Sequence, residues 1–523
     1  MKALESLTGV RTQGENMKKN SKILIGACAL YLLLLGLLYH MERAAGNPGF
    51  ASFGDAIWYS LVTMTTVGYG DVTPVTAGGK LIGIVFALCS IGILTALIGI
   101  GLRLIGSRLI PQLRLVGRRH RPWYIFEEEN ADSVTLAEAI RQEVPGCVLL
   151  FLSGEESGIE AVRMQIQPEL FLGRLRGREN VTCFFMGEDP WQNFSLALKA
   201  AQTGLPIYCM SDADAEDIPR NLHLFQREDA LSRFYWQTHP LSREESAVVL
   251  IGCGSCGSAL LERALLTNVF QRGRYIRYHV FRDTAQFQAL HHELCRALSR
   301  EDVPDDRVFF HGEDWTADPE LIRQADRIIL CADSDAENLS QLELLKRWFV
   351  HPERVHVRLS ESVPGVESFG GREEVLTPEF VLKDAVNRQA VLMNDLYNAG
   401  SEHPTAWTDL SAFHRQSNIA AADHLLVKVR YLLDDDSLTA LSEADCRRAY
   451  ARYKELYPER EELFQEMEHR RWMRFSQMCN WKYAPVRDNS RRLHPLLIPF
   501  EELPPAEKKK DDFAWELLGK LTL

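Results

Sequence analysis

The pattern of apolar and polar residues separates a short N-terminal part of the chain from a long C-terminal part. Two uncharged apolar runs lie near the N-terminus, at residues 23–39 and 81–102. At the helical rise of about 1.5 Å per residue they would reach about 26 Å and about 33 Å, close to the ~30 Å hydrocarbon core of a bilayer. We therefore predict two transmembrane helices. Residues 53–64 between them are moderately apolar but too short to span, which predicts a re-entrant helix.

A glycine-containing motif follows that short segment and reads Thr65-Thr66-Val67-Gly68-Tyr69-Gly70-Asp71. Gly68 and Gly70 permit left-handed backbone angles, so that successive carbonyl groups can point the same way. Four copies would line an axial pore with carbonyl oxygens and the Thr66 hydroxyl, which replace the hydration shell of K⁺. The predicted ion site thus consists of Thr66, Val67, Gly68, Tyr69 and Gly70.

This motif resembles the selectivity filter of potassium channels. The order of span, short helix, filter and span resembles the two-transmembrane-helix prokaryotic potassium channel, over about residues 20–110. The resemblance implies that K⁺ is the conducted ion and that the chain forms a homotetramer, because one chain supplies a quarter of a filter. It also implies that Trp58 hydrogen bonds to Asp71 behind the filter. Val62 stands where some relatives carry a glutamate coupled to that aspartate.

The second apolar run departs from the family at the gating hinge. Ser90 stands where many relatives have the hinge glycine, and Gly92, Gly99 and Gly101 follow it. Glycine weakens a helix interior by about 1 kcal/mol relative to alanine, so Gly92 or the Gly99–Gly101 pair are candidates for the bend. Close packing between helices explains these glycines equally well.

Positive charges set the expected orientation. Lys18, Lys19 and Lys22 precede the first run, six arginines follow the second within residues 103–121, and Arg43 and Lys80 lie between the runs. The positive-inside rule then places both termini in the cytoplasm. We expect a multi-pass protein of the plasma (inner) membrane of a prokaryote, in contact with the lipid bilayer.

The rest of the chain has the character of soluble domains. The whole sequence carries a net charge of −12, which argues against nucleic acid as a partner. Its 11 cysteines form no disulfide framework and are expected to be reduced thiols.

A second glycine motif lies in this part. A buried-strand run at 247–251 leads into Gly252-Cys-Gly254-Ser-Cys-Gly257 and then into an apolar helical stretch at 258–266. Strand, G-x-G-x-x-G and helix in that order form the dinucleotide-binding fingerprint, in which the backbone approaches a phosphate at a helix N-terminus. Further strands are predicted at 276–281, 308–310 and 327–331, which implies a parallel, doubly wound sheet.

The residues after those strands, Gly312-Glu-Asp and Ala332-Asp333-Ser-Asp-Ala-Glu-Asn-Leu, resemble the regulator of potassium conductance (RCK, TrkA-N-like) domains over about residues 245–395. In that family the fold binds nucleotides or calcium and drives gating. The resemblance implies a site for a nucleotide such as NAD, ADP or AMP. Asp283 is placed to accept from a ribose hydroxyl, whereas the adjacent Arg282 would favour a phosphorylated ribose. An empty site that keeps its glycines for turn geometry is the alternative. The predicted nucleotide-binding residues are Gly252, Gly254, Gly257, Asp283, Gly312 and Asp333.

Residues 111–244 repeat this organisation more faintly. Strands are predicted at 122–126, 147–151, 181–185 and 205–209, with helical segments at 134–141 and 194–201. Glu127-Glu128-Glu129-Asn130 occupies the place of the glycine loop. Three carboxylates repel a phosphate, so we expect no dinucleotide there and interpret the segment as a degenerate first RCK-like Rossmann domain.

The C-terminal segment carries aromatic and basic residues in a proline framework, in the stretches 468–472, 480–488 and 493–511. It resembles the small domain first defined in ryanodine receptors (RyR domain), except that Asn480 replaces a usual glycine. Aromatic rings there can stack on a base, and cations can hold phosphate. Tryptophans that form a core, with the domain as a docking surface, are the alternative. The candidate ligand residues are Arg471, Trp472, Trp481, Tyr483, Arg487 and His494.

Together these features predict a multidomain chain: an α-helical transmembrane pore domain, two α/β Rossmann-like domains and a small, mainly α-helical C-terminal domain. We expect a K⁺-selective channel gated by a small-molecule ligand, with no enzymatic activity because no catalytic constellation is visible. A membrane-tethered nicotinamide-dependent oxidoreductase and a non-conducting receptor or scaffold are the alternatives. The predicted segments are 1–20, 21–110, 111–244, 245–400 and 401–523.

Overall fold

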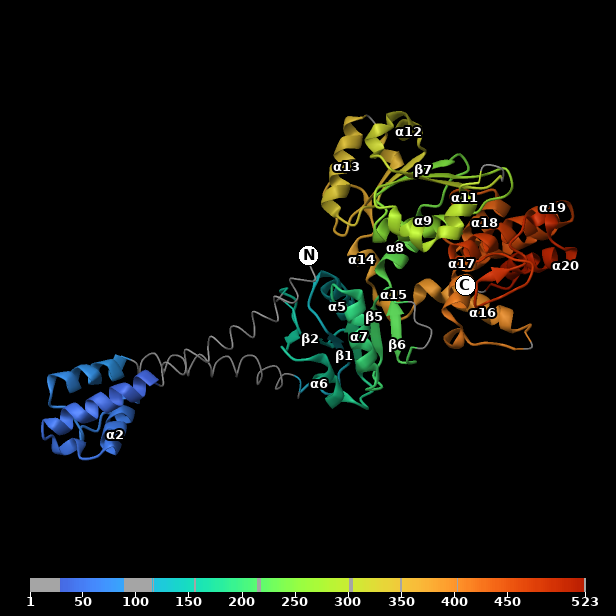
Figure 1. Cartoon of the computed structure of the whole chain (residues 1–523). Helices are drawn as coiled ribbons and strands as arrows, with labels where there is room; N and C mark the ends of the chain where they lie inside the picture. The colour runs from blue at the N-terminus through green and yellow to red at the C-terminus, as the bar shows by residue number, and fades with distance from the viewer. Residues whose placement is uncertain are drawn as a thin grey trace. The chain divides into compact units, whose positions relative to one another are not determined.

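The computed structural model describes residues 29–88, 115, 117–154, 157–213, 218–300, 304–348, 350–401 and 403–521. The chain forms two compact units, Met1–Gly117 and Arg118–Leu523. The helix α2 belongs to the first unit, and the labelled sheets belong to the second (Figure 1).

Within residues 29–88, the first unit consists of three helices around one apolar core. Residues 29–44 and 77–88 are helical, and α2 (Phe53–Met64) has the bounds that the apolar pattern predicts. A capping box begins α2, since the Asp55 carboxylate accepts a hydrogen bond from the Ser52 amide at 2.7 Å. A short 3-10 helix, η1 (Pro48–Phe50), precedes it. The core contains Leu35, Leu38, Phe50, Ala56, Ile82 and Phe86.

Among the helices that the structure describes, none combines the length and the apolar character needed to cross a membrane. The predicted spans at 23–39 and 81–102 extend beyond the described residues. The hinge candidates Ser90, Gly92, Gly99 and Gly101 also lie outside them.

The second unit contains two six-stranded parallel sheets with the same topology. The first has the order β3-β2-β1-β4-β5-β6 and the second β12-β11-β10-β7-β8-β9. Counted from its own first strand, each sheet has the order 3-2-1-4-5-6, which is that of the dinucleotide-binding fold. The predicted repeat of a parallel α/β domain is therefore confirmed. The strands are β1 (Trp123–Phe126), β2 (Val148–Phe151), β3 (Val162–Arg163), β4 (Val181–Phe185), β5 (Ile207–Met210), β6 (Leu222–Phe225), β7 (Ala247–Ile251), β8 (Arg277–Phe281), β9 (Arg307–His311), β10 (Arg327–Leu330), β11 (Val355–Arg358) and β12 (Ser368–Phe369).

Helices cover both faces of the second sheet, as alternate residues of β7 show. Val248 and Leu250 belong to one apolar cluster together with Leu260 of α9, whereas Val249 and Ile251 belong to another. Successive strand residues face opposite sides of a sheet, so a strand buried on both sides reads as a continuous apolar run. The helices of the two α/β domains are α5 (Ala131–Glu143), α6 (Pro168–Leu172), η3 (Gly173–Leu175), α7 (Pro190–Ala201), α8 (Arg227–Thr238), α9 (Ser255–Thr267), α10 (Ala285–Leu290), α11 (His292–Leu298), η4 (Trp315–Ala317), α12 (Pro319–Gln324), α13 (Asp335–Arg347), η5 (Pro352–Arg354), α14 (Arg372–Val375), α15 (Pro378–Val381) and η6 (Ala385–Asn387).

The region after the second sheet is mainly helical, as predicted. Its longest element, α19, contains Pro458 and leaves helical geometry at Arg460, because proline cannot donate the hydrogen bond of a helix interior. Its elements are α16 (Arg388–Asn398), η7 (Trp407–Asp409), α17 (Ala412–Asp423), α18 (Leu425–Leu433), α19 (Glu443–Met478), β13 (Lys482–Tyr483), β14 (Leu493–His494), η8 (Phe500–Glu502), α20 (Pro505–Lys508), η9 (Lys509–Asp512), α21 (Phe513–Glu516) and η10 (Leu517–Gly519).

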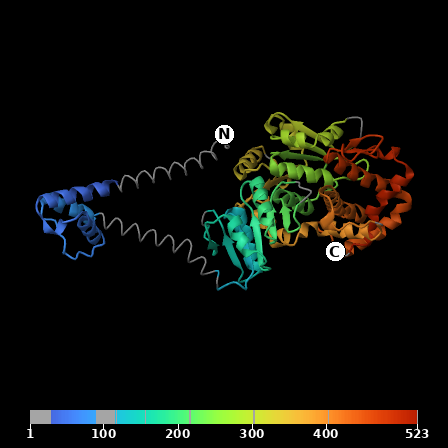
Figure 2. The same cartoon turned by 60° about the horizontal axis from the view of Figure 1, so that its bottom comes forward.

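The part of this helical region that covers residues 403–521 packs directly on the second α/β domain. Its red helices lie beside the green elements in both views (Figures 1 and 2). Arg474 of α19 donates to Asp305 at 2.7 Å and to Asp306 at 3.1 Å, and His424 contacts the Val269 carbonyl at 2.7 Å. Because the Arg474 and Asp306 side chains are buried, the ion pair is part of the interface core.

Candidate pore and ligand sites

In the backbone that follows α2, residues with left-handed φ angles alternate with residues outside that region. Thr66, Gly68 and Gly70 have φ angles of 61°, 59° and 75°, while Val67 and Tyr69 between them are outside the left-handed region. Alternation of this kind turns successive carbonyl groups to the same side. The sequence predicted the left-handed glycines but not Thr66, whose side chain makes that conformation costly by about 1–2 kcal/mol.

The end of α2 anchors this segment through its carbonyl groups. The Val62 carbonyl accepts hydrogen bonds from the Val67 amide at 3.0 Å and the Gly68 amide at 3.3 Å. The Thr66 amide donates to the Thr63 carbonyl at 3.1 Å. The N–H groups of Thr66, Val67 and Gly68 are thus turned toward the end of α2.

Trp58 supports the segment from the side. Its indole Nε1 donates to the Asp71 carboxylate at 2.9 Å, which is the contact expected from the sequence. The Trp58 ring also stacks on Tyr69, with centroids 6.0 Å apart and planes 2° from parallel. Trp58 therefore connects α2 with both Tyr69 and Asp71.

Glu42 is a site residue that the sequence analysis did not identify. Its side chain is fully buried, and its carboxylate accepts hydrogen bonds from the Val75 amide at 2.9 Å and the Thr76 amide at 3.0 Å. The Asn47 amide and the Thr76 hydroxyl also donate to it, at 2.7 and 2.5 Å. A carboxylate directly after an apolar run was the available signal. Glu42 fixes the end of the first helix to the segment that follows Asp71.

The glycine loop of the second sheet has the predicted backbone form. Gly252 follows β7 with a φ of 99°, and a Cβ there would lie 2.6 Å from the Ala332 backbone. A Cβ at Gly257 would lie 1.8 Å from the Gly252 carbonyl oxygen. Close packing of β7, α9 and the end of β10 therefore requires both glycines, whether or not a ligand binds.

Asp333 occupies the N-terminus of α9. Its carboxylate accepts hydrogen bonds from the Ser255 amide at 3.0 Å and the Cys256 amide at 2.9 Å. A Cβ at Gly254 would lie 2.3 Å from an Asp333 oxygen. These amides are the donors that hold phosphate in a dinucleotide fold. In this chain an internal carboxylate uses them.

The other predicted nucleotide residues surround this loop at the carboxyl edge of the sheet. Asp283 follows β8, is exposed and has a φ of 52°, and Gly312 follows β9 with no atom within 4 Å of a Cβ built on it. Arg282 is already paired, because its guanidinium donates to Asp314 and, at 2.7 Å, to Glu337. Asp283 and Gly312 are accessible to a ligand, whereas Arg282 is bound to carboxylates.

The first sheet carries acids where the second carries glycines. Burial, followed by the charges of Glu128 and Glu169, raises the pKa of Glu127 to about 7. Glu129 is buried and forms an ion pair with Arg163 at 2.8 Å. The expectation that this loop binds no dinucleotide stays a prediction.

The candidate residues of the C-terminal region fall into two groups. Arg471 lies inside, where its Nε donates to Glu468 at 2.8 Å, so it is not available at the surface. Trp472 and Trp481 flank His494, with ring centroids 5.0 and 6.1 Å from it. Burial and the charge of Arg487 lower the pKa of His494. Tyr483 and Arg487 are exposed beside this aromatic cluster.

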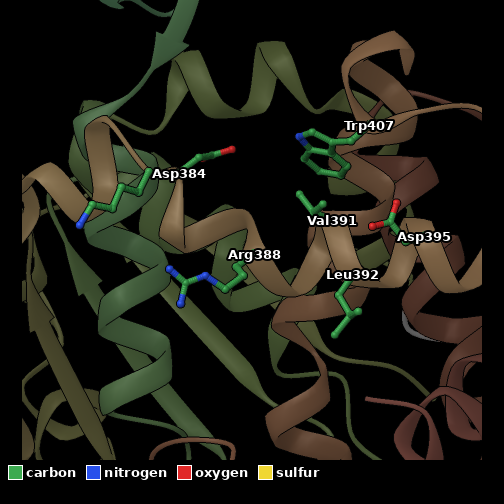
Figure 3. Close-up of a pocket in the computed structure, with 7 residues that line it drawn as sticks. Asp384, Arg388, Val391, Leu392, Asp395 and Trp407 are labelled. Atoms are coloured by element: carbon green, nitrogen blue, oxygen red, sulfur yellow. The ribbon is translucent and has the colours of Figure 1, made fainter. Parts of the chain in front are cut away.

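A cavity of about 390 Å³ lies near the start of α16, at a place that carries no sequence motif. Figure 3 shows Trp407, Val391 and Asp395 on one side and Asp384 and Arg388 on the other. The Arg388 side chain is 72% exposed and lies 3.7 Å from Glu379. The lining combines an aromatic ring with side chains of both charges, so it does not favour a ligand of one sign.

The first unit is similar in sequence to known channels. Residues 27–106 match the family model described as an ion channel. The voltage-gated potassium channel of Aeropyrum pernix is 46% identical over 77 residues, which are 15% of this chain and 23% of that protein. Potassium voltage-gated channel subfamily A member 5 of Mustela putorius furo is 37% identical over 94 residues, 17% of this chain and 15% of that protein.

Two solved structures align with much of the chain at low similarity. The structure titled GsuK Channel has a TM-score of 0.34 and 16% identity, covering 70% of this chain and 100% of its own. The structure titled GsuK channel bound to NAD has a TM-score of 0.31 and 13% identity, covering 80% and 85%. Scores this low establish no shared fold. This chain spans less than a quarter of the length of the potassium channels that it matches, so the similarity concerns the first unit alone.

Proposed function

We propose that the chain forms a K⁺-selective channel whose opening is controlled by a nucleotide-like ligand. The observation that carries the proposal is the alternation of left-handed residues at Thr66, Gly68 and Gly70, in a segment similar to potassium channels. Carbonyl rings built from four such segments would coordinate dehydrated K⁺. The proposal therefore includes a homotetramer in a prokaryotic inner membrane.

The filter role has a test with a matched control. Gly68 and Gly46 both have positive φ, at 59° and 68°, and a Cβ on either meets no atom within 4 Å. Alanine therefore costs similar local strain at both positions. In liposomes that contain the purified chain, Gly68→Ala should abolish K⁺ flux, whereas Gly46→Ala should retain it. Equal flux from both variants would reject the filter assignment.

Gating is assigned to the RCK-like α/β domains and the RyR-like C-terminal region. Asp283 and Gly312 are open at the carboxyl edge of the second sheet, and Trp472, Trp481 and His494 form the aromatic cluster of the helical region. A ligand opens or closes a channel only if it binds the two states with different affinity. Residues 103–120 join the two units and would transmit the change.

The second α/β domain is the less open of the two ligand sites, because Asp333 already uses the amides of α9. A nucleotide phosphate would have to displace that carboxylate. The C-terminal cluster has no such competitor among the described contacts of Tyr483 and Arg487, where Arg487 donates only to Asn489 at 2.8 Å. We infer that binding at the C-terminal cluster is the stronger candidate for ligand control.

Flux measurements with NAD, ADP and AMP test this assignment. Arg487→Gln should weaken the nucleotide effect on K⁺ flux, while Arg491→Gln, an exposed arginine of the same loop, should not. Hydride transfer to a substrate without flux would instead favour a membrane-tethered oxidoreductase. Ligand binding without either activity would favour a non-conducting receptor.

A further inference from the structure

A small cavity lies where the second α/β domain meets the helical region. Its volume is about 30 Å³, and three arginines line it: Arg243, Arg274 and Arg430. Arg243 lies shortly before β7, Arg274 lies between α9 and β8, and Arg430 belongs to the last turn of α18. Three cations from separate segments thus meet at one point.

Arg430 is buried without enough acceptors. The residue is 5% exposed, and its Nη2 donates to the Asp436 backbone carbonyl at 2.8 Å. The Asp436 carboxylate lies 3.4 Å from the same nitrogen. Its other terminal nitrogen, Nη1, has no hydrogen-bond partner in the described part of the chain. A buried donor without an acceptor is unfavourable, and more so when it is charged.

Arg274 also has a buried donor without an acceptor. Its guanidinium stacks on the Phe270 ring, 3.4 Å from the centroid, and its Nη2 donates to the Ser242 carbonyl. The Nε–H is buried, and no residue described by the structure accepts from it. The stacking fixes the plane of the guanidinium, so this donor cannot rotate away to find water.

The cavity lining also contains one carboxylate, that of Asp436, which lies 3.4 Å from Arg430 and 3.5 Å from Arg243. Asp434 pairs with Arg243, and Asp436 accepts from the Arg243 amide at 2.9 Å. Burial lowers the pKa of Arg274 to about 10, and the like charge of Arg430 contributes to that shift although Asp436 opposes it. The lining thus holds three arginines and one carboxylate, so positive charge is in excess there.

We propose that this cavity binds a small anion, which accepts hydrogen bonds from Arg274 Nε and Arg430 Nη1. The volume is about that of one water molecule in the liquid, so it admits a halide or one oxygen atom of an oxyanion such as phosphate. Guanidinium groups are suited to such anions because their donors form charge-assisted hydrogen bonds. A bound anion would join α18 to the turn at Arg274 and stabilise the contact between the two domains.

The test uses the full-length chain in detergent, in chloride-free buffer at constant ionic strength. Chloride, bromide and phosphate are added separately, and the Tm is followed by tryptophan fluorescence. We expect a saturable rise in Tm for at least one of these anions. Arg430→Met and Arg274→Met should raise the half-saturating concentration at least about tenfold, because each removes one charge-assisted hydrogen bond. The comparison of halide with phosphate identifies which kind of anion enters.

Arg296→Met is the matched control, since the Arg296 side chain is 79% exposed on α11 and the change removes the same charge. It should keep the wild-type anion response. The proposal fails if all variants respond equally, or if wild type shows no saturable response, which would mean that water alone fills the cavity. If the two arginine variants do not fold, bromide anomalous diffraction from wild-type crystals decides. A bromide peak between Arg274 and Arg430, or the electron density of phosphate there in crystals grown with phosphate, supports the site, and the absence of both overturns it.

Discussion

The Asp333 carboxylate lies 2.9 Å from the Cys256 amide, at the point where a dinucleotide fold holds phosphate. The Asp333 side chain of this chain thus occupies the phosphate position of the glycine loop. Because a carboxylate and a phosphate compete for the same helix N-terminus, Asp333 opposes nucleotide binding in this conformation.

Replacing Asp333 with asparagine should therefore strengthen nucleotide binding at this loop. We expect affinity for ADP to rise about tenfold, since removal of a neighbouring like charge is worth about 1 kcal/mol or more. Calorimetry with the purified chain measures it. Asp318→Asn is the control, because Asp318 caps α12 in the same way at 3.1 Å from the Leu321 amide but lies outside the loop. Weaker binding in Asp333→Asn would mean that Asp333 contacts the ligand directly.

Trp58→Phe should destabilise the proposed filter segment, Thr66–Gly70, while preserving α2. The change removes the indole donor to Asp71 but keeps an aromatic ring against Tyr69. A hydrogen bond to a charged group contributes about 1.5–3 kcal/mol, less where it is exposed. We expect faster loss of K⁺ flux over time and a lower K⁺/Na⁺ ratio. Trp191→Phe, at a tryptophan that is 64% exposed on α7, should leave both unchanged.

Glu42→Gln should lower the stability of the first unit by about 1–3 kcal/mol, because an amide cannot accept from all the donors around this buried carboxylate. Thermal unfolding of the purified chain in detergent measures the loss. Thr76→Val removes one of those donors. The double variant should lose less than the sum of the single changes, since both act on one network. Strict additivity would contradict a direct Glu42–Thr76 interaction.

Through His291, we expect the contact between α9 and α19 to depend on pH. Its Nδ1 lies 2.8 Å from the Met478 carbonyl and its Nε2 lies 2.8 Å from Glu262, so only the protonated ring donates to both. Burial lowers the pKa of His291, but Glu262 and the Met478 carbonyl raise it more, and the net shift is upward. Its contribution to stability is therefore fully present below about pH 6.5 and is lost as pH rises through the folded-state pKa.

His291→Gln should flatten the fall in unfolding free energy above pH 6.5, measured by denaturant titration at several pH values. His292→Gln is the control, since the neighbouring His292 side chain is 63% exposed. Burial lowers the pKa of His424 to about 3. Its contribution to stability below pH 6.5 is therefore opposite in sign to that of His291. Both variants retain His424, so the difference between His291→Gln and His292→Gln isolates the contribution of His291. Equal slopes would contradict the prediction.

Glu127→Gln should stabilise the first α/β domain at high pH. Since burial, followed by Glu128 and Glu169, raises the pKa of Glu127 to about 7, the folded state binds the proton more tightly than the unfolded state. Ionisation above that value is then unfavourable to folding. We expect a gain of about 1–2 kcal/mol at pH 8, allowing for partial exposure, and little change at pH 4. Glu138→Gln, at an exposed position of α5, should have no such effect.

Much of the fold was predictable from local sequence. The run at 181–185 and β4 coincide, as do the run at 247–251 and β7, because a strand buried on both faces is continuously apolar. The short strands β3, β6, β11 and β12 were not predicted, since two to four residues carry little periodicity. The sequence also placed Arg471 at a ligand surface, whereas Glu468 holds it in the interior. A helix position alone does not tell which side a cation faces.

The sequence by itself determined the short helix at 53–64, the filter motif, the glycine loop and the doubled α/β pattern, because each depends on neighbouring residues and on steric limits of the backbone. Only the tertiary structure decided which groups meet across long separations. Asp333 reaches the amides of α9, Glu42 reaches Thr76, and Arg274 meets Arg430. Such pairings arise from the packing of separate elements, so the availability of a phosphate or anion site follows from the fold and not from the motif.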